Sequence, residues 1–432
     1  MVAPLSQASN NSTGMSGYTS SCGAGASTSA YVGTQQLAVL PGCSSSGMGE
    51  IQRSTGTADL GGTATYTLGA DVDIHSEIHY TYNLAPLPNS ADKWGYMIGL
   101  KIIKDVTIKV GTSDWEKIDQ ASMLAMAQLE MTTAEYKLWS AGLGGLERAP
   151  EEGEDVIGGG KLMCCVKGGY RGQLFVAAMP YQSVTVKVNF STALECAHNP
   201  NALSTQPAAV NPVNFALYTK QHILSPYERG LMQSTDIIQL LGTTQYFTKP
   251  LPATTIGGEI QPIDLSFFNE YCTHIAVWCN RNGGGGFALA GSDGRGGQGD
   301  SIALLDNCEF VYNGTSAQGK QPASLLEHSN MMGLAGGGMG SHWTSGTNIL
   351  NNVNENPHVM LFQLANTPCV TSLSVSQSQF APFAGGDGIS NNRYDVIQFK
   401  AETLSARSDA IIHFVAFGAQ SILYSAGGAV KN

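Results

Sequence analysis

Charged residues are scarce in this chain of 432 residues, where Asp, Glu, Lys and Arg together make up 13% of the sequence. A typical soluble domain carries about 25%. The balance is acidic, with a formal net charge of −11, and the basic residues form no cluster along the sequence. Because binding to nucleic acid through its phosphates needs clustered Lys and Arg, we expect no direct nucleic-acid partner. A weakly charged surface is compatible with broad contacts between subunits.

Long apolar runs are also missing. No stretch approaches the roughly 20 residues of a membrane-spanning helix, and no basic segment followed by an apolar one marks a signal peptide at the N-terminus. The nine cysteines are irregularly spaced and include no Cys-x-x-Cys pair, which argues against a disulfide framework. We therefore expect reduced, buried thiols in an intracellular compartment and a chain that is soluble where it is made.

The signatures of common enzymes are absent too. There is no Gly-x-Ser-x-Gly, no His-Glu-x-x-His and no Cys and His set with metal-ligand spacing. GTSAQGK at 314–320 fits the phosphate-loop pattern, but Gln321 and Pro322 follow where a Ser or Thr and a helix are needed. Since Asn313-Gly314 is a strong hairpin signal, we interpret this segment as a turn. The motifs therefore supply no catalytic residue.

What the sequence has instead is glycine, with 52 residues, and alternation of apolar with polar residues. Residues 184–190 alternate most cleanly, which is typical of a half-buried strand. About eight such short strands in each half, with few helical patterns between them, predict antiparallel sandwiches of the jelly-roll type. Further strands are expected at 71–82, 96–110, 161–166, 173–179, 263–267, 275–279, 304–312, 359–364, 373–376, 396–399 and 411–417.

A helix is predicted within 111–131, with Ser113 or Asp114 as its cap. Residues 147–160 are expected to form an acidic surface loop. Two long glycine-rich loops, 283–300 and 333–346, are expected between strands of the second half.

The length predicts two domains of about 200 residues each. We place a Ser/Gly-rich N-terminal arm at 1–61, a first jelly roll at 62–216, an inter-domain joint at 217–241 and a second jelly roll at 242–432. The arm is too polar and small to bury much area, so we expect it to lie along a neighbour or beneath an assembly. In the joint, Pro226 suits the start of a short helix that Gly230 limits.

One row of ionisable residues is the main candidate for a site. Asp71, Asp73, His75, Glu77 and His79 alternate along the strand expected at 71–82. Because alternate residues are about 6.5–7 Å apart, two of them could share a metal only with help from another strand. A polar face toward solvent or a neighbouring subunit is the commoner arrangement, and we assign no metal site. If subunits share this face, its two histidines would make contacts sensitive to mildly acid pH.

Three other histidines, His222, His274 and His413, stand among apolar strand residues and are expected to be packed or hydrogen-bonded in the core. Acceptor sequences for N-linked glycans occur at Asn10, Asn11, Asn189 and Asn313. They matter only if the chain meets a glycosylation machinery.

A carbohydrate-binding or carbohydrate-processing β-sandwich is the competing class. Its sugars would stack on Trp94, Trp278 or Trp343, and Glu151 or Asp155 would act as acids. This class needs a pair of carboxylates in a cleft about 5–10 Å apart, which the sequence does not reveal.

Several segments resemble, in order and spacing, the double jelly-roll major capsid proteins of the nucleocytoplasmic large DNA viruses, most closely those of large algal viruses. The matching segments are 103–115, 179–191, 227–229 with 237–247, 304–314, 362–377 and 413–429. The resemblance covers roughly residues 70–430 and not the start of the chain. Family members open with a short helix and a strand carrying a Phe-Lys-like motif, whereas residues 1–61 here are rich in Ser and Gly.

The resemblance implies an all-β protein of two consecutive antiparallel jelly-roll sandwiches with long loops and a few short helices. It also implies a homotrimer that forms a pseudo-hexagonal capsomer of an icosahedral shell, with no catalysis and no cofactor. The expected location is the virion capsid, assembled in the host cytoplasm. Expected partners are copies of the chain, minor capsid proteins and inner membrane-associated proteins. The resemblance leaves open whether the surface carries glycans. A minor capsid component of the same fold is the alternative. The loops 283–300 and 333–346 would then lie at the outer tower or between protomers.

Overall fold

The structure is a computed structural model of residues 1–432. It describes residues 28–32, 35–40, 45–87, 93–94, 97–131, 133–144, 155–166, 173–198, 213–252, 257–268, 271–281, 304–316, 319–326, 359–363, 389–390, 396–403, 410–425 and 428–431. The predicted strand at 373–376 and the two long loops, 283–300 and 333–346, lie outside these residues.

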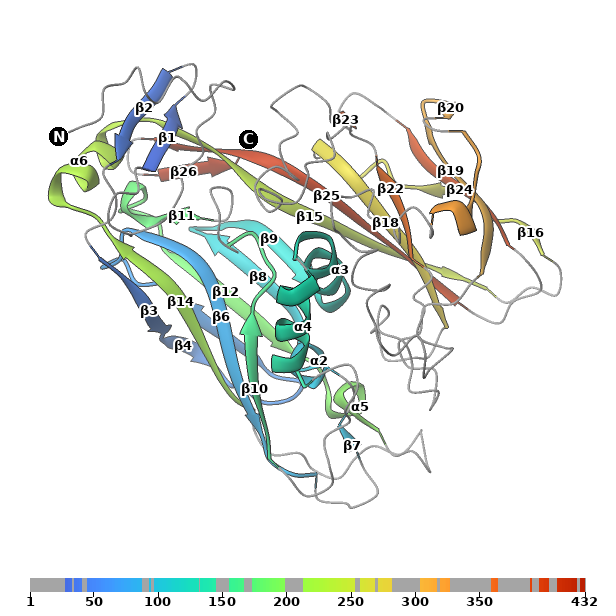
Figure 1. Ribbon diagram of the computed structural model, residues 1–432, viewed down its shortest axis with the longest axis horizontal. Helices are drawn as coiled ribbons and strands as arrows, with labels where there is room; N and C mark the ends of the chain where they lie inside the picture. Colours follow the sequence, from blue (N-terminus) through green and yellow to red (C-terminus); the bar gives the residue numbers. More distant parts are fainter. Residues whose placement is uncertain are drawn as a thin grey trace.

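The first half of the chain forms a sandwich of two antiparallel sheets (Figure 1). One sheet has the order β10-β6-β14-β3, with β11 beside β6. Its strands are β3 (Ser45–Ile51), β6 (Ile74–Leu84), β10 (Val156–Lys161), β11 (Leu174–Phe175) and β14 (Asn214–Ile223). The other sheet has the order β4-β5-β12-β8-β9. Its strands are β4 (Arg53–Gly56), β5 (Thr63–Thr67), β8 (Ile103–Val110), β9 (Ser113–Asp119) and β12 (Val184–Phe190).

The second half forms another sandwich. One sheet has the order β15-β25-β18-β22, with β23 beside β18 and β26 beside β25. Its strands are β15 (Ile237–Leu251), β18 (Tyr271–Arg281), β22 (Val359–Gln363), β23 (Ile389–Ser390), β25 (Ala410–Ser425) and β26 (Gly428–Lys431). The other sheet has the order β16-β24-β19-β20, with β17 beside β24 and β21 beside β19. Its strands are β16 (Gly258–Glu259), β17 (Ile263–Asp264), β19 (Leu305–Tyr312), β20 (Thr315–Ser316), β21 (Gln321–Pro322) and β24 (Ile397–Thr403).

The two sandwiches repeat one strand order. In each, the first strand of one sheet lies beside a strand from the end of that half, and a central strand follows on the other side: β3-β14-β6 in the first half and β15-β25-β18 in the second. In the opposite sheets, β5-β12-β8-β9 corresponds to β17-β24-β19-β20. All of these pairings are antiparallel, for example β14 with β6 and β25 with β18. The predicted all-β class and antiparallel sandwiches are confirmed.

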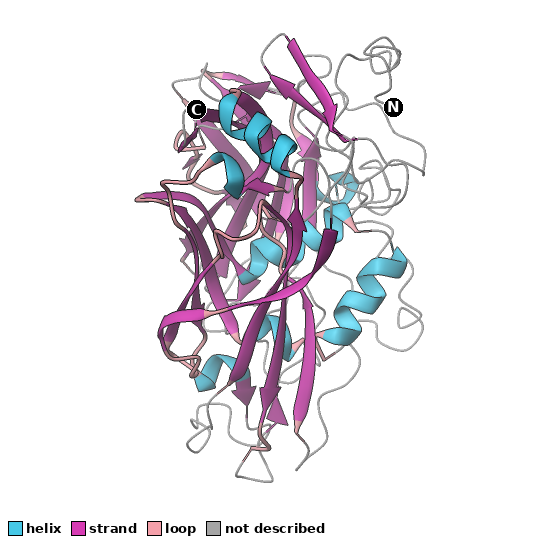
Figure 2. Cartoon of the chain, turned by 90° about the vertical axis from the view of Figure 1, so that its left-hand side faces the viewer, coloured by secondary structure: helices cyan, strands magenta, loops and turns pink. Residues whose placement is uncertain are grey.

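The helices are few and short, and Figure 2 shows them between and beside the strands. They are α2 (Ile98–Lys101), α3 (Gln120–Glu130), α4 (Thr133–Gly142), η1 (Val176–Ala178), α5 (Ala193–Cys196), α6 (Pro226–Ser234) and a single helical turn at 323–326. In the described part of the chain, no helix is long and apolar enough to cross a membrane.

The predicted start of the helix within 111–131 is wrong. Gly111, with a φ of 59°, reverses the chain after β8, so Ser113–Asp119 pairs back on β8 as the strand β9. The helix α3 begins only at Gln120, where the carboxylate of Asp119 accepts a hydrogen bond from the backbone N–H of Ser122. Residues that can cap a helix therefore occur at Ser113 and at Asp119. The helix begins after Asp119 because Ser113 belongs to the β8–β9 hairpin.

Other predicted boundaries also shift. The helix α2 interrupts the strand expected at 96–110. The strand β10 begins within the predicted loop at 147–160, because its glycines hide the strand pattern. Residues 162–166 and 176–179 are buried as expected but are not strands. Phe267 is 46% exposed and its neighbour Phe268 is buried, so the alternation expected at 263–267 stops after Leu265.

The connection between the sandwiches is the capped helix α6. Ser225 and Glu228 form a capping box, and Pro226 occupies the start of the helix as predicted. Residues 217–223 belong to β14 and 237–241 to β15, so the joint between the strands is shorter than the segment 217–241. Part of the expected arm is also structured, because β3 pairs with β14 and β4 with β5. Before them, β1 (Thr28–Val32) and β2 (Gln35–Leu40) form a hairpin.

The second sandwich packs one face of a sheet on the first sandwich. In β18, Ile275, Val277 and Cys279 belong to the core of the second sandwich, whereas Ala276 and Trp278 belong to the core cluster of the first. In β25, Val415 and Phe417 also belong to that first cluster. The helix α3 contacts β25 and β9 contacts β15, and α3 lies between the two sandwiches in Figure 1.

Candidate functional site on strand β6

The predicted row of ionisable residues falls on β6 and the segment just before it. Asp71 and Asp73 precede the strand, and His75, Glu77 and His79 lie on it. Asp73 and His75 are buried, whereas the side chains of Glu77 and His79 are 27% and 34% exposed. The expectation of one continuous polar face toward solvent or a neighbouring subunit is therefore wrong for Asp73 and His75, whereas Asp71 is exposed and Glu77 and His79 are partly exposed.

His75 is held as a neutral, buried ring. Its Nδ1 lies 3.3 Å from the hydroxyl of Thr219 on β14, and its Nε2 lies 3.3 Å from the carbonyl oxygen of Gly69. Burial lowers the pKa of His75 to about 4, because an imidazolium would lose its hydration there. His75 is thus a structural link between the two central strands of the sheet.

Asp73 fastens the helix α6 to the first sandwich. One carboxylate oxygen accepts hydrogen bonds from the backbone N–H of Leu224, at 2.6 Å, and from Nη2 of Arg229, at 3.0 Å. The other lies 2.7 Å from Nε of Arg229. The hydrogen bonds and charge of Asp73 raise the pKa of the guanidinium.

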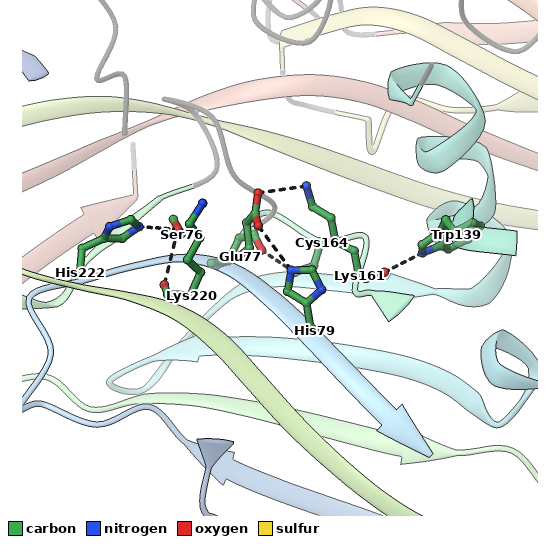
Figure 3. A network of polar contacts seen from close by, with 9 residues as sticks. Ser76, Glu77, His79, Trp139, Lys161, Cys164, Lys220 and His222 are labelled. Atoms are coloured by element: carbon green, nitrogen blue, oxygen red, sulfur yellow. Dashed lines mark hydrogen bonds and ion pairs between the residues drawn. The ribbon is translucent and has the colours of Figure 1, made fainter. Parts of the chain in front are cut away.

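Glu77 is the centre of a surface network, drawn in Figure 3. Its carboxylate lies 3.5 Å from Nζ of Lys161 on β10 and 3.4 Å from Nε2 of His79. Partial burial by itself raises the pKa of Glu77, but the hydrogen bond from His79 and the charges of Lys161 and Lys220 outweigh it, so the pKa falls to about 2. The carboxylate is therefore charged at any physiological pH.

A bulge in β6 adds a second, buried contact. Lys220 of β14 pairs with Glu77 and the next residue, Gln221, pairs with His75, so Ser76 is the extra residue. Its hydroxyl lies 2.7 Å from Nε2 of the buried His222 (Figure 3). Burial lowers the pKa of His222. The prediction that His222 is a hydrogen-bonded core residue is confirmed.

The polar residues on and beside β6 are suited to binding another surface. Within the described ranges, no three His, Cys, Asp or Glu side chains come together as a group that could hold a metal ion. The face carries paired opposite charges, tyrosine and small polar side chains, which suit binding to another protein surface.

Comparisons with known proteins bear on the fold. No family model matches the sequence, and no curated protein matches it. Among solved structures, the chain is similar to VP54 of the virus PBCV-1, with a TM-score of 0.69 and 14% identity over 90% of this chain and 96% of that one. It is also similar to the major capsid proteins of Faustovirus, with a TM-score of 0.57 and 8% identity over 89% and 91%, and of mavirus, with a TM-score of 0.51 and 9% identity over 89% and 90%.

The chain folds as a double jelly roll. The repeated strand order and the similarity over about nine-tenths of the chain agree on this point. The resemblance seen in the sequence is thereby confirmed at the level of the fold.

The residues of the competing carbohydrate site do not form one in the double jelly roll. Trp94 and Trp278 are buried, so the expectation that they stack on sugars is wrong. Asp155 is exposed beside β10, while Trp343 and Glu151 lie outside the described residues. Trp278 stacks instead on His413, which is buried as predicted. His274 lies on β18, and its side chain lies outside the description.

Asn313-Gly314 forms the turn of a hairpin between β19 and β20, as predicted. Asn313 and Gly314 have φ angles of 46° and 84°, which is the left-handed pair that a two-residue hairpin requires. The strand β21 follows Lys320 directly, where a phosphate loop needs a helix, and Lys320 pairs with Glu402.

Of the glycan acceptor sequences, Asn189 is half-buried on β12, where it donates to Asp105 and accepts from Thr63. Asn313 is exposed in its turn, and Asn10 and Asn11 lie outside the described residues.

The residues that contact the β6 row could not be predicted from the sequence. Lys161, Thr219 and Lys220 reach it only through the pairing of β6 with β10 and β14. The alternation of each strand shows which residues share a face, but the register between strands 80 to 145 positions apart leaves no signal in a single sequence.

Proposed function

We propose that this chain is a structural capsid protein that self-assembles into trimeric, pseudo-hexagonal capsomers of the icosahedral shell of a large DNA virus. The observation that carries the proposal is the double jelly roll itself, similar over about 90% of the chain to three viral capsid proteins. The chain acts as a building block and not as an enzyme.

The physical reasoning starts from the duplication. Each protomer contributes two sandwiches of the same strand order, so three protomers in a ring supply six similar bodies. A closed ring uses heterologous contacts, in which one surface of a protomer meets a different surface of the next. The low charge content of 13% favours burying broad flanks, because few ions lose their hydration in the contact.

The proposed location, partners and domain limits follow from the same role. Its location is the virion capsid, assembled in the host cytoplasm, and its partners beyond itself are minor capsid proteins and inner membrane-associated proteins. The N-terminal arm, up to residue 61, runs along a neighbour or beneath the capsomer, and the domain limits at 62–216, 217–241 and 242–432 belong to this proposal.

The test is the mass and shape of the purified full-length chain. Native mass measurement at increasing concentration is expected to give a trimer of 45.4 kDa chains, and electron micrographs to give hexagonal outlines. A chain that stays monomeric at high concentration, with no assembled form in micrographs, contradicts the proposal. Copy number in purified particles separates a major from a minor shell component.

A further inference from the structure

The two hydrophobic cores of the double jelly roll differ in where their residues come from. Among the described residues, every member of the second core lies between Leu251 and Ala416, inside the second half of the chain. The first core takes residues from both halves, and its last members are Ile422, Tyr424 and Ala429. The second core can therefore form from its own half, whereas the first core is incomplete until these last residues join it.

The residues after 417 lie as a strap across the first jelly roll. The β25–β26 strap consists of residues 418–425 of β25 together with β26, and Figure 1 shows both strands in red beside the first sandwich. In the register of the two strands, Tyr424 is opposite Ala429. Both are buried in the first core, whereas the next residue, Val430, is 55% exposed, as the alternation of side chains along a strand requires.

Aromatic packing holds the strap in place. The ring centroid of Tyr424 lies 5.3 Å from that of Phe175 on β11 and 6.4 Å from that of Trp115 on β9. Phe175 and Trp115 are each 2% exposed. Without the strap, water would reach these rings, and the first jelly roll would lose the stabilisation that comes from burying apolar surface. A first jelly roll without its strap is therefore open and weakly stable.

Three hydrogen bonds fix the position of the strap. The hydroxyl of Tyr424 donates to Oε1 of Gln239 at 2.9 Å, and Nε2 of Gln239 donates to the carbonyl oxygen of Gln173 at 2.8 Å. The backbone N–H of Ala429 donates to Oε1 of Gln182 at 2.8 Å. Because hydrogen bonds need defined distances and angles, the strap docks in one position and does not cover the core loosely.

The strap is synthesised after every other part of the first core. The strand β14 ends at Ile223, and the strap follows about 200 residues later, which at roughly 5–20 residues per second takes about 10–40 s. During this interval the first core lacks its last members. The second core ends at Ala416, so all of its residues have been made before the strap is.

We propose that the β25–β26 strap gates self-assembly. Until the strap docks, the first jelly roll has no fixed shape to offer a neighbouring copy, because contacts between proteins need surfaces that pack as closely as a protein interior. Once the strap docks, both jelly rolls are rigid and the chain can join other copies. This inference rests on the proposed self-assembly and adds a regulatory step to it: only chains synthesised through the strap and fully folded take part.

The test compares two neighbouring positions of β26 in the full-length chain. Ala429→Asp places a carboxylate in the first core and is expected to displace the strap, whereas Val430→Asp adds the same charge on the exposed side and is the matched control. Hydrogen exchange is measured at a concentration below that of assembly. Ala429→Asp is expected to raise exchange in the first-core strand β12 by about tenfold or more and to leave the second-core strand β19 within about twofold. Val430→Asp is expected to leave both strands unchanged.

A second variant keeps the test decisive if Ala429→Asp does not fold. Gln182→Ala removes the hydrogen bond to Ala429, and Gln182 belongs to neither core. It is expected to raise exchange in β26 and, by about threefold, in β12, with β19 unchanged. Native mass measurement then checks the gating. Ala429→Asp is expected to stay monomeric at concentrations about tenfold above those at which the unmodified chain and Val430→Asp assemble.

The outcomes separate this inference from the proposed function. Equal increases of exchange in β12 and β19 in both variants, or no increase in β12 in either, overturn the inference. If Ala429→Asp loosens β12 but assembles like the control, the gating is overturned while the proposed function stands. If the unmodified chain itself stays monomeric at every concentration, the proposed function fails and the gating fails with it.

Discussion

The imidazole of His413 lies flat against the indole of Trp278, with ring centroids 5.1 Å apart and ring planes 1° apart. The two residues are directly opposite each other on β25 and β18. The Nδ1 of His413 is 2.9 Å from the hydroxyl of Tyr246 on β15, and that hydroxyl also bonds to Asp119 at the start of α3. A carboxylate can only accept, so the hydroxyl donates to Asp119 and accepts from Nδ1–H of a neutral His413.

The burial of His413 and His75 as neutral rings predicts a loss of stability in mild acid. Burial lowers the pKa of His413 to about 3 and that of His75 to about 4, whereas a histidine in an unfolded chain titrates near 6.5. Below about pH 6.5 the unfolded chain binds protons that the folded chain excludes. The free energy of unfolding therefore decreases as the pH is lowered below about 6.5, by up to about 1.4 kcal/mol per pH unit for each histidine. Above about pH 7 these two histidines do not change the stability with pH.

Urea denaturation of the full chain between pH 7.5 and pH 5 measures this slope. The control is His413→Gln, which has no titrating group at this position and is expected to show a shallower slope, with the difference confined to pH values below 6.5. An identical slope in the variant would show that His413 is protonated in the folded chain.

The end of the chain completes the core of the first jelly roll, and this gives the second prediction. Tyr424 on β25 is fully buried against Trp115 and Phe175, and its hydroxyl donates to Oε1 of Gln239 at 2.9 Å. Tyr424→Ala is expected to cost about 3–5 kcal/mol because it leaves a large cavity. Tyr424→Phe removes one buried hydrogen bond and is expected to cost about 1–2 kcal/mol.

Chemical denaturation followed by near-ultraviolet circular dichroism checks both values. Tyr227→Ala, at a side chain that is 78% exposed on α6, is the control and is expected to change the stability by less than about 0.5 kcal/mol. Should Tyr424→Ala prove as mild as the control, this end of β25 is not part of the cooperative core.

The sequence contains enough to predict the fold class and several local structures, for reasons that are local. The alternation at 184–190 reappears as the burial pattern of β12, because the residues that alternate are the ones that meet the core. Pro226 and the turn at Asn313 were also predictable, since a proline or an Asn-Gly pair constrains its own backbone.

Long-range choices were not predictable. The sequence allows a helix from Ser113 as well as from Asp119, and only the pairing of β9 with β8 selects the second. Because β10 contains several glycines, its sequence shows no alternation of apolar and polar residues and looks like a loop. Only its pairing with β6 makes it a strand. Trp278 looks like an exposed sugar platform in a β-sandwich, and the first jelly roll, far away in sequence, is what buries it.

The ion pair of Asp73 with Arg229 gives the third prediction. Asp73 is 4% exposed, whereas Arg229 is 43% exposed, so the two partners are not equivalent. Asp73→Ala leaves the backbone N–H of Leu224 without its acceptor and releases α6, and a cost of about 3 kcal/mol is expected. Arg229→Ala is expected to cost less, because water can reach part of the vacated site.

Denaturation at low and high salt distinguishes this pair from a surface pair. The control is Lys104→Ala, which removes a pair with Glu195 at 3.8 Å whose side chains are 57% and 38% exposed and is expected to change the stability by less than about 1 kcal/mol. The cost of Asp73→Ala should persist in 1 M salt. A cost that disappears with salt would mean that Asp73 acts only through screened charge.

Two glycines give the last prediction, with opposite signs. Gly314 has a φ of 84° in the turn between β19 and β20, where a Cβ is strained even though open space surrounds it, so Gly314→Ala is expected to cost about 1–2 kcal/mol. Gly230 lies inside α6 with no atom within 4 Å of an added Cβ, and Gly230→Ala is expected to stabilise by about 0.5–1 kcal/mol. Both substitutions add one methyl group in open space, so only the backbone conformation separates them. Urea denaturation of the two variants side by side measures the difference, and equal effects would mean that the left-handed turn at Gly314 does not form.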